Sequence, residues 1–338
     1  MGRSALALTA PSRSAGWQKA RLARAFLRGD PVLCTWQLSP RCDAFCHLCE
    51  HRAETGGDEL DGAACSAVAA ELGRASSLLV SFTGSEPFLH GELAEIVRAT
   101  AAWHFPLLVT NGCLVSAARA REVWEAGLEA ATVALEDGLA ERHDAVTGVV
   151  GSHARALAAL ATLARERTRA TQRVGLRVRL RGADLGPLER VLGVAAAHGV
   201  SVTVEGSVPL PVLDPERAAA LASDLRRLKQ RHPQLRSSEH ALASFGIALA
   251  GGVKECVAGR AFFNVDHRGR ISKCLEHRGP EHRVGSLPGH KAVELVPLLR
   301  ERHARNQCRD CWYASRAEVE SLYTLRGFVS GFATLVRA

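Results

Sequence analysis

The chain has 338 residues, of which 47% are hydrophobic and 23% charged, enough for one large domain and a smaller one. Its formal net charge of +8 permits an anionic partner, but aromatic residues make up only 5% of the chain, so no nucleic-acid partner is expected. No apolar run is long enough to span a bilayer, and the ten cysteines come without a signal peptide. We therefore expect a soluble cytoplasmic protein in a reducing compartment.

The first thirty residues predict a basic helical extension. Residues 17–28 alternate basic and apolar side chains at helical spacing. Such a helix either packs on the domain as an ordinary amphipathic helix or lies peripherally on an anionic membrane.

From residue 33 onward, short apolar runs alternate with alanine-rich amphipathic stretches, which is the pattern of repeated β-α units around a parallel sheet. The predicted strands are 33–38, 78–83, 106–110, 131–135, 174–180 and 201–205. The predicted helices are 61–72, 91–103, 116–126, 152–167, 187–198 and 215–231. The fold class is α/β, and six units over residues 31–232 predict a partial (β/α)6 barrel of the TIM type. Chemistry in such barrels sits at the carboxyl ends of the strands.

Three cysteines, Cys42, Cys46 and Cys49, follow the first predicted strand with the spacing C-x3-C-x2-C. Three thiolates on one loop can hold three corners of a [4Fe-4S] cube and leave the fourth iron without a protein ligand. A closed zinc site usually takes four ligands, so zinc would need a distant histidine here.

On this motif the chain resembles the radical S-adenosylmethionine enzymes. The resemblance implies that the open iron binds S-adenosylmethionine and that its reductive cleavage gives a deoxyadenosyl radical, which abstracts a hydrogen atom from substrate. It also implies an electron donor such as flavodoxin or ferredoxin as a partner. The position before the last cysteine, usually aromatic in this family, is Leu48 here.

Two strand ends add candidates for cofactor binding. The second strand ends in Thr83-Gly84-Ser85-Glu86-Pro87, which resembles the Gly-Gly-Glu-Pro motif of the family. This implies that Gly84, Ser85 and Glu86 bind the cofactor, with Glu86 orienting its methionyl amine. Asn111 follows the third strand in a Thr-Asn-Gly like that of the family, although an ordinary strand-to-helix turn explains it without a ligand.

The fifth strand carries apolar residues on one face and arginines on the other, at Arg173, Arg177, Arg179 and Arg181. The apolar face should meet the helices, so the arginines should point into the lumen, where they need anionic partners. Arg179 is the candidate ligand of the cofactor carboxylate, and the others call for Glu205 or an anionic substrate. With Ser81, Thr83 and Thr110, the pattern predicts a polar, net basic cavity. The alternative is a solvated basic face on an edge-like strand.

The last third of the chain predicts a linker over 233–245, a small α+β domain over 246–314 and a C-terminal helix over 315–338. A hairpin over 261–274 lies between Cys256 and Cys274, and a C-x2-C pair follows at Cys308 and Cys311. This arrangement resembles the twitch domain, the short form of the SPASM extension, and implies an auxiliary [4Fe-4S] cluster on these four cysteines. The alternative is a four-cysteine zinc site.

These features predict an enzyme that abstracts a hydrogen atom from its substrate by means of S-adenosylmethionine, with the auxiliary cluster assisting oxidation or positioning. A small polar metabolite is the expected substrate, a ribosomally made peptide the second choice and a membrane lipid the third. Glu205, Glu136 and Tyr313 are the candidates for proton transfer. From a different class, the chain could be a metal-binding module without catalytic activity. The net reaction stays open between oxidation, crosslinking, epimerisation, rearrangement and adenosylation.

Overall fold

The structure is a computed structural model that describes residues 15–46, 49, 58–75, 78–207, 210–253, 256–277, 279–309 and 311–322. Leu48 and most of the helix predicted over 315–338 lie outside these residues.

One sheet of nine strands organises the chain, in the order β6-β5-β4-β3-β2-β1-β7-β8-β9. The strands are β1 (Leu33–Trp36), β2 (Leu79–Phe82), β3 (Phe105–Thr110), β4 (Ala130–Ala134), β5 (Arg173–Leu180), β6 (Ser201–Gly206), β7 (Phe262–Val265), β8 (Arg270–Ser272) and β9 (Arg283–Ser286). From β6 to β7 all neighbours are parallel, and only β8 and β9 are antiparallel. The six predicted strands are confirmed, each within two residues at either end.

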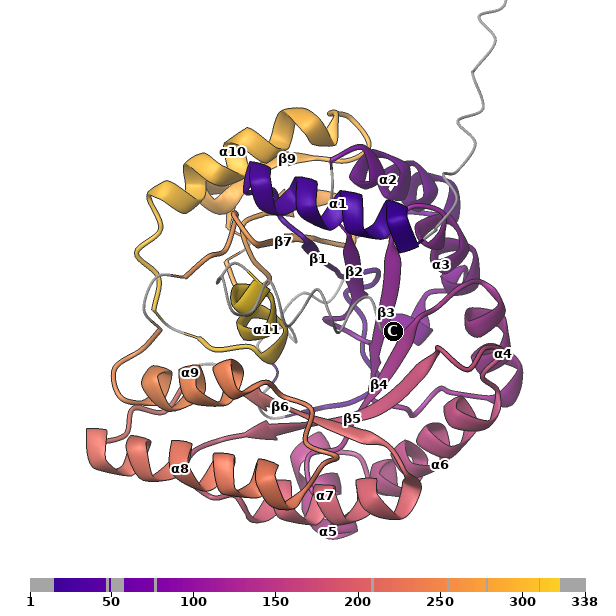
Figure 1. Ribbon diagram of the computed structural model, residues 1–338. Helices are drawn as coiled ribbons and strands as arrows, with labels where there is room; N and C mark the ends of the chain where they lie inside the picture. The colour runs from indigo at the N-terminus through magenta and orange to yellow at the C-terminus, as the bar shows by residue number, and fades with distance from the viewer. Residues whose placement is uncertain are drawn as a thin grey trace, which may run out of the picture.

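Most of the helices surround this curved sheet on its outer side (Figure 1). The helices of the described part are α1 (Ala15–Arg28), α2 (Gly62–Arg74), α3 (Leu93–Ala101), α4 (Ala117–Glu125), α5 (Ala140–Thr147), α6 (Ser152–Arg165), α7 (Gly186–His198), α8 (Pro215–Arg231), α9 (Glu239–Leu249), α10 (Ala292–Ala304) and α11 (Ala314–Leu322), with short 3-10 turns η2 (Pro87–Leu89) and η3 (Pro280–His282). Helix α11 lies inside the ring instead (Figure 1). The predicted β-α alternation is therefore confirmed, and with it the partial barrel of the α/β class.

Local capping fixes where the helices begin. Asp61 accepts a hydrogen bond from the backbone N–H of Ala64 at 2.8 Å at the start of α2, and Asp214 does the same for Arg217 at 2.9 Å at the start of α8. The apolar stripe of each helix then packs on the outer face of the sheet, so one continuous core joins Leu72 of α2 to Leu225 of α8.

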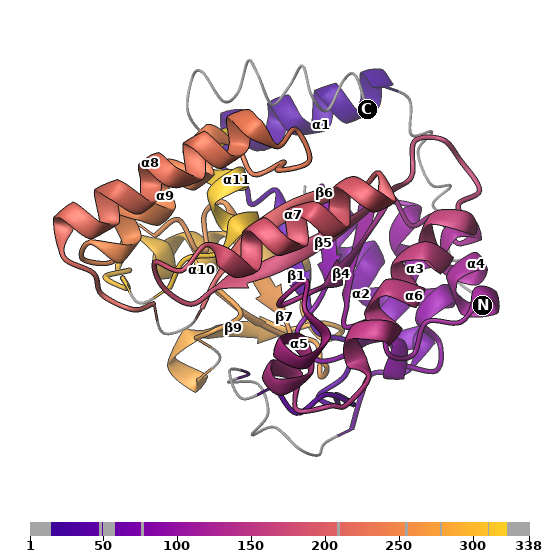
Figure 2. The same cartoon turned by 90° about the horizontal axis from the view of Figure 1, so that it is seen from below.

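Helix α1 packs at the amino ends of the strands (Figure 2). The Arg21 guanidinium donates to the carbonyl oxygens of Gly73, at the end of α2, and Trp103, just before β3. These contacts fit the first of the two alternatives for the basic helix, a helix packed on the domain. Within the described part, no single helix has the length and apolar character to cross a membrane, and α5 and α6 pass that test only when joined across a 101° bend.

The stretch predicted as a linker over 233–245 carries the first half of α9 instead. The helix begins at Ser238, whose side chain accepts a hydrogen bond from the N–H of Ala241 at 3.1 Å. Helix α9 packs against α8 and α11, and Phe245 on α9 lies 4.7 Å from Trp312, ring centre to ring centre. The predicted hairpin is present as β7 and β8, but β7 continues the barrel sheet beside β1. A separate domain over 246–314 stays a prediction.

Gly269 provides a test of how tightly the hairpin is held. Its φ is +74°, and an added Cβ would overlap the carbonyl oxygen of Leu287. Gly29 is the matched control, because its φ is +61° and nothing lies within 4 Å of its added Cβ. Both substitutions to alanine carry the backbone cost of a left-handed residue, and only Gly269→Ala adds the clash. We expect Gly269→Ala to lower the free energy of unfolding by roughly 2–4 kcal/mol more than Gly29→Ala, read from thermal unfolding. Equal losses would contradict this packing.

Candidate active site

A cavity of ≈ 330 Å³ lies inside the curved sheet. Lumen-facing residues of the parallel strands form one part of its wall, and residues of the C-terminal segment form the other. The two cysteine groups meet here, because one member of the first group and all four of the second line this cavity: Cys49, Cys256, Cys274, Cys308 and Cys311.

The first cysteine loop lies at the carboxyl ends of the strands, as predicted. Cys46 and Cys49 form one tight turn, with the Cys49 N–H donating to the carbonyl of Cys46 at 3.1 Å. Burial raises the pKa of the Cys42 thiol to about 12 and that of Cys46 to about 11, and nearby thiols add to both shifts. A metal bound here has to displace these protons, because thiolate is the ligand form.

Glu86 is buried and already engaged by three internal donors. Its Oε1 accepts from the Thr110 hydroxyl at 2.8 Å and from the Phe88 N–H at 3.0 Å, and its Oε2 accepts from the Asn111 N–H at 2.8 Å. Burial raises its pKa to about 7. Glu86 therefore fixes the ends of β2 and β3, and Thr110 serves this network without lining the cavity.

Asn111 connects this network to the cysteine loop. Its Nδ2 donates to Asp43 Oδ1 at 2.7 Å and lies 3.8 Å from the Cys42 sulfur, while the Glu86 N–H donates to the carbonyl of Arg41 at 3.0 Å. Gly84 lines the cavity with a φ of +100°, and a Cβ there would meet the Gln37 side chain. Ser85 is half-buried at the same strand end. The residues predicted to bind cofactor thus lie together beside the first cysteine group.

The two arginines in the middle of β5 point inward, as the alternation predicts. Arg177 and Arg179 line the cavity with Glu205 of β6, the register neighbour of Arg179. Arg179 lies close enough to Cys46 to lower the pKa of that thiol. The cavity is less polar than predicted, because β1, β3 and β7 add Leu33, Leu107 and Phe262 to its wall.

Glu136, at the end of β4, is buried beside the same arginines. Its Oε2 is 3.9 Å from the Arg181 guanidinium and accepts no hydrogen bond within the described part of the chain. The charge of Glu136 acts to raise the pKa of Arg177, of Arg179 and of Cys46.

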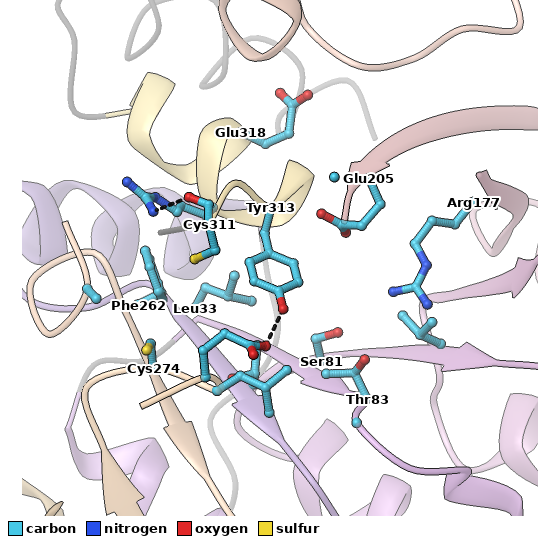
Figure 3. A pocket seen from close by; sticks show the side chains of 18 of the residues that line it. Leu33, Ser81, Thr83, Arg177, Glu205, Phe262, Cys274, Cys311, Tyr313 and Glu318 are labelled. Atoms are coloured by element: carbon cyan, nitrogen blue, oxygen red, sulfur yellow. Dashed lines mark hydrogen bonds between the residues drawn. The ribbon is translucent and has the colours of Figure 1, made fainter. Parts of the chain in front are cut away.

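The second cysteine group surrounds one side of the cavity, and Tyr313 points into the space between it and the barrel wall (Figure 3). The Tyr313 hydroxyl donates to the carboxylate of Glu276, and burial, followed by the charge of Glu276, raises the Tyr313 pKa. Burial raises the pKa of Cys274 to about 11. Burial also raises the pKa of Cys311, and the neighbouring thiols Cys256 and Cys308 raise it further.

Sequence reasoning missed two residues of this site, Glu276 and His277. The His277 Nε2 lies 3.1 Å from the Cys308 sulfur, and its N–H donates to the Cys274 sulfur at 3.3 Å. Their position directly after Cys274 was a signal, because residues around a metal ligand commonly orient it.

The donor sets fit the predicted clusters in kind. Three thiols on one loop and four thiols on one wall of the cavity are soft ligands of the type that iron–sulfur clusters take. Among the described residues, no three Cys, His, Asp or Glu side chains lie close enough together to hold a metal ion.

The raised pKa of Glu86 gives a testable pH dependence. The folded chain holds this proton up to about pH 7 and the unfolded chain releases it near the ordinary value of 4.5, so ionisation of Glu86 weakens folding as the pH rises. We expect the stability of the wild type relative to Glu86→Gln to fall as the pH rises from about 4.5 to about 7 in thermal unfolding, and to change little at higher pH. The exposed Glu95→Gln is the control. A wild-type advantage that grows with pH would contradict the assignment.

A scan against models of known protein families finds no match. The chain is similar to PqqA peptide cyclase of Rhodopseudomonas palustris, with 33% identity over 132 residues, 38% of this chain and 35% of that protein. It matches PqqA peptide cyclase of Methylocella silvestris at 25% identity over 301 residues, 85% of this chain and 75% of that protein. The AdoMet-dependent heme synthase of Oleidesulfovibrio alaskensis matches at 28% identity over 129 residues, 37% of this chain and 33% of that protein. The chain thus spans about a third of the length of the first and last of these relatives.

Solved structures share the fold. Streptococcus suis SuiB bound to precursor peptide SuiA superposes with a TM-score of 0.65 at 12% identity, over 85% of this chain and 70% of that chain. The structure of anSMEcpe with bound AdoMet gives 0.61 at 12% identity, over 91% of this chain and 100% of that chain. The cysteine motif after the first strand, the partial barrel and the sequence matches together support the resemblance to the radical S-adenosylmethionine enzymes.

Proposed function

We propose that the chain is an enzyme that removes a hydrogen atom from an unactivated carbon of a peptide substrate, with S-adenosylmethionine as cofactor. One observation carries the proposal: Cys49 of the first group and all four cysteines of the second line the same cavity. When bound, a cluster with one open iron supplies the electron that cleaves S-adenosylmethionine and gives the radical chemistry.

In this proposal the barrel residues hold the catalytic cluster and orient the cofactor. Cys42, Cys46 and Cys49 bind the catalytic cluster, and the strand end at Gly84 and Ser85 leaves backbone groups open to the cofactor amine. Glu86 acts by fixing the ends of β2 and β3, since its carboxylate already accepts three internal hydrogen bonds. Asn111 holds the cysteine loop through Asp43. Arg179 is the ligand for the cofactor carboxylate, which its closeness to Cys46 supports.

The C-terminal residues would provide the acceptors for an electron and a proton. Cys256, Cys274, Cys308 and Cys311 would hold the auxiliary cluster, which would supply an electron acceptor for a net oxidation or crosslink. Such a step releases a proton, and Tyr313 together with Glu276 offers an acceptor at the cavity wall. Glu205 is the second candidate acceptor in the cavity, and Glu136 lies toward the cofactor side. The electron for the first cluster comes from a partner such as flavodoxin or ferredoxin.

A peptide substrate has more support than the small polar metabolite expected from sequence. A relative that matches 85% of this chain is a PqqA peptide cyclase, and the SuiB structure holds a precursor peptide. Structures of anSMEcpe also contain peptides. A cavity of ≈ 330 Å³ would hold one or two inserted side chains while the rest of a peptide stays outside. The metabolite stays the second candidate because heme synthases are also among the relatives.

The formation of deoxyadenosine under reduction tests the proposal. We expect anaerobically reconstituted wild type to release deoxyadenosine from S-adenosylmethionine with dithionite. Cys46→Ala should abolish this release, because the open-iron cluster needs all three thiolates. Cys308→Ala should retain a measurable rate, since the second group does not carry the cleavage. Cys65→Ala, which changes a buried thiol of α2 outside both groups, is the control.

A wild type that holds iron yet releases no deoxyadenosine would contradict the proposal. That result would favour a non-catalytic metal-binding module. Release that survives Cys46→Ala would instead show that another site performs the cleavage.

A further inference from the structure

Arg177 is a cation that faces the cavity inside the barrel, where the charges of Glu205 and Glu136 act on it without a direct contact within the described residues. Within the described residues, no hydrogen bond or salt bridge reaches its guanidinium. The side chain points into the cavity from β5, opposite Ser81 and Thr83 (Figure 3). Burial, followed by the neighbouring charge of Arg179, lowers its pKa.

Several other buried or half-buried arginines of this protein are paired, although Arg179, like Arg177, has no ion pair within the described residues. Arg190 binds Asp137 at 2.7 Å, Arg270 binds Asp266 at 2.5 Å, and Arg316 binds Glu320 at 2.8 Å. Placing an arginine in a low-dielectric cavity without such a partner costs stability. An unpaired arginine in a cavity therefore suits a ligand that brings the missing anion.

The strand register gives Arg177 and Arg179 different neighbours. Arg177 lies beside Ala134 of β4 and Thr203 of β6, two small side chains that leave room for a ligand. Arg179 lies one layer closer to the carboxyl ends, beside Glu205, and acts on Cys46. The charge of Tyr313 acts on both arginines, and only Arg179 acts on Cys46. We therefore assign the cofactor carboxylate to Arg179, which leaves Arg177 for the substrate.

The remaining charges of the cavity select the kind of anion. Two further cations line the cavity, but Arg316 is paired with Glu320 and Lys273 donates to Asn306. Glu205, Glu276 and Glu318 line the same cavity, so a dianion such as a phosphate monoester would meet repulsion. A single carboxylate matches the planar fork of one guanidinium and neutralises it.

We propose that Arg177 binds a carboxylate of the substrate and so makes the enzyme selective for an acidic group near the reacting carbon. This inference rests on the proposed function and deepens it. For a peptide substrate, the group is an aspartate or glutamate side chain inserted into the barrel.

Binding of two short peptides tests the inference without radical chemistry. The probes are acetyl-Ala-Glu-Ala-amide and acetyl-Ala-Gln-Ala-amide, measured by ligand-observed NMR titration against cluster-loaded protein with S-adenosylmethionine present. We expect wild type to favour the glutamate peptide by about tenfold or more, as for a charge-assisted hydrogen-bonded pair. Arg177→Gln should lose this preference, and Arg173→Gln, an exposed position on the same strand, should keep it.

Affinity for S-adenosylmethionine distinguishes the two sources of carboxylate. Arg179→Gln should weaken cofactor binding about tenfold, while Arg177→Gln should leave it within about twofold. A tenfold loss of cofactor affinity in Arg177→Gln would overturn the inference, as would a wild type that does not distinguish the peptides or an Arg177→Gln variant that still does.

Stability provides the final check. Removing an unpaired buried cation should leave the melting temperature of Arg177→Gln unchanged or raise it. A clear fall would show that Arg177 is a structural ion-pair partner and overturn the inference. If Arg177→Gln does not fold, Arg177→Lys keeps the charge without the fork and should show a weakened preference for glutamate. Deoxyadenosine release by a protein that fails the peptide test leaves the proposed function standing and removes only this inference.

Discussion

The pairing of β7 with β1 is the interaction on which the rest of the site depends. Four residues of each strand run parallel in register, from Leu33 beside Phe262 to Trp36 beside Val265. Because β1 leads directly into the first cysteine loop and β7 begins the hairpin between Cys256 and Cys274, this ladder brings two distant parts of the chain to one cavity. Without it, the second cysteine group would have no fixed place relative to the barrel.

A second constraint is the balance of charge inside the barrel. The lumen combines arginines from β5 with carboxylates from β6 and the C-terminal segment, surrounded by apolar side chains of β1, β3 and β7. The buried Glu86 carboxylate accepts hydrogen bonds from three internal donors, which compensate for its loss of hydration. The guanidinium groups of Arg177 and Arg179 instead face the cavity. Polar groups that serve the fold are thus paired within the protein, and those left open are the ones available to ligands.

Much of this arrangement could be predicted from the sequence. The β-α alternation and the arginine periodicity of β5 predict the barrel and its lumen, because strand alternation decides which side chains face inward. The continuation of the sheet through β7 could not be predicted, since nothing local to residues 262–265 specifies β1 as its neighbour. Helix α9 was missed because Ser238 suggests a turn as readily as a cap. The internal bonding of Glu86 and the contact between Glu276 and Tyr313 depend on tertiary packing.

The most direct measurement of the central claim is the iron, sulfide and zinc content of anaerobically reconstituted protein. Wild type is compared with a variant in which Cys42, Cys46 and Cys49 are all alanine. We expect about eight irons per chain in the wild type and about four in the variant, because each cysteine group would hold its own four-iron cube. About four irons falling to none, with zinc retained, would contradict the second cluster and remove the electron acceptor from the proposed oxidation.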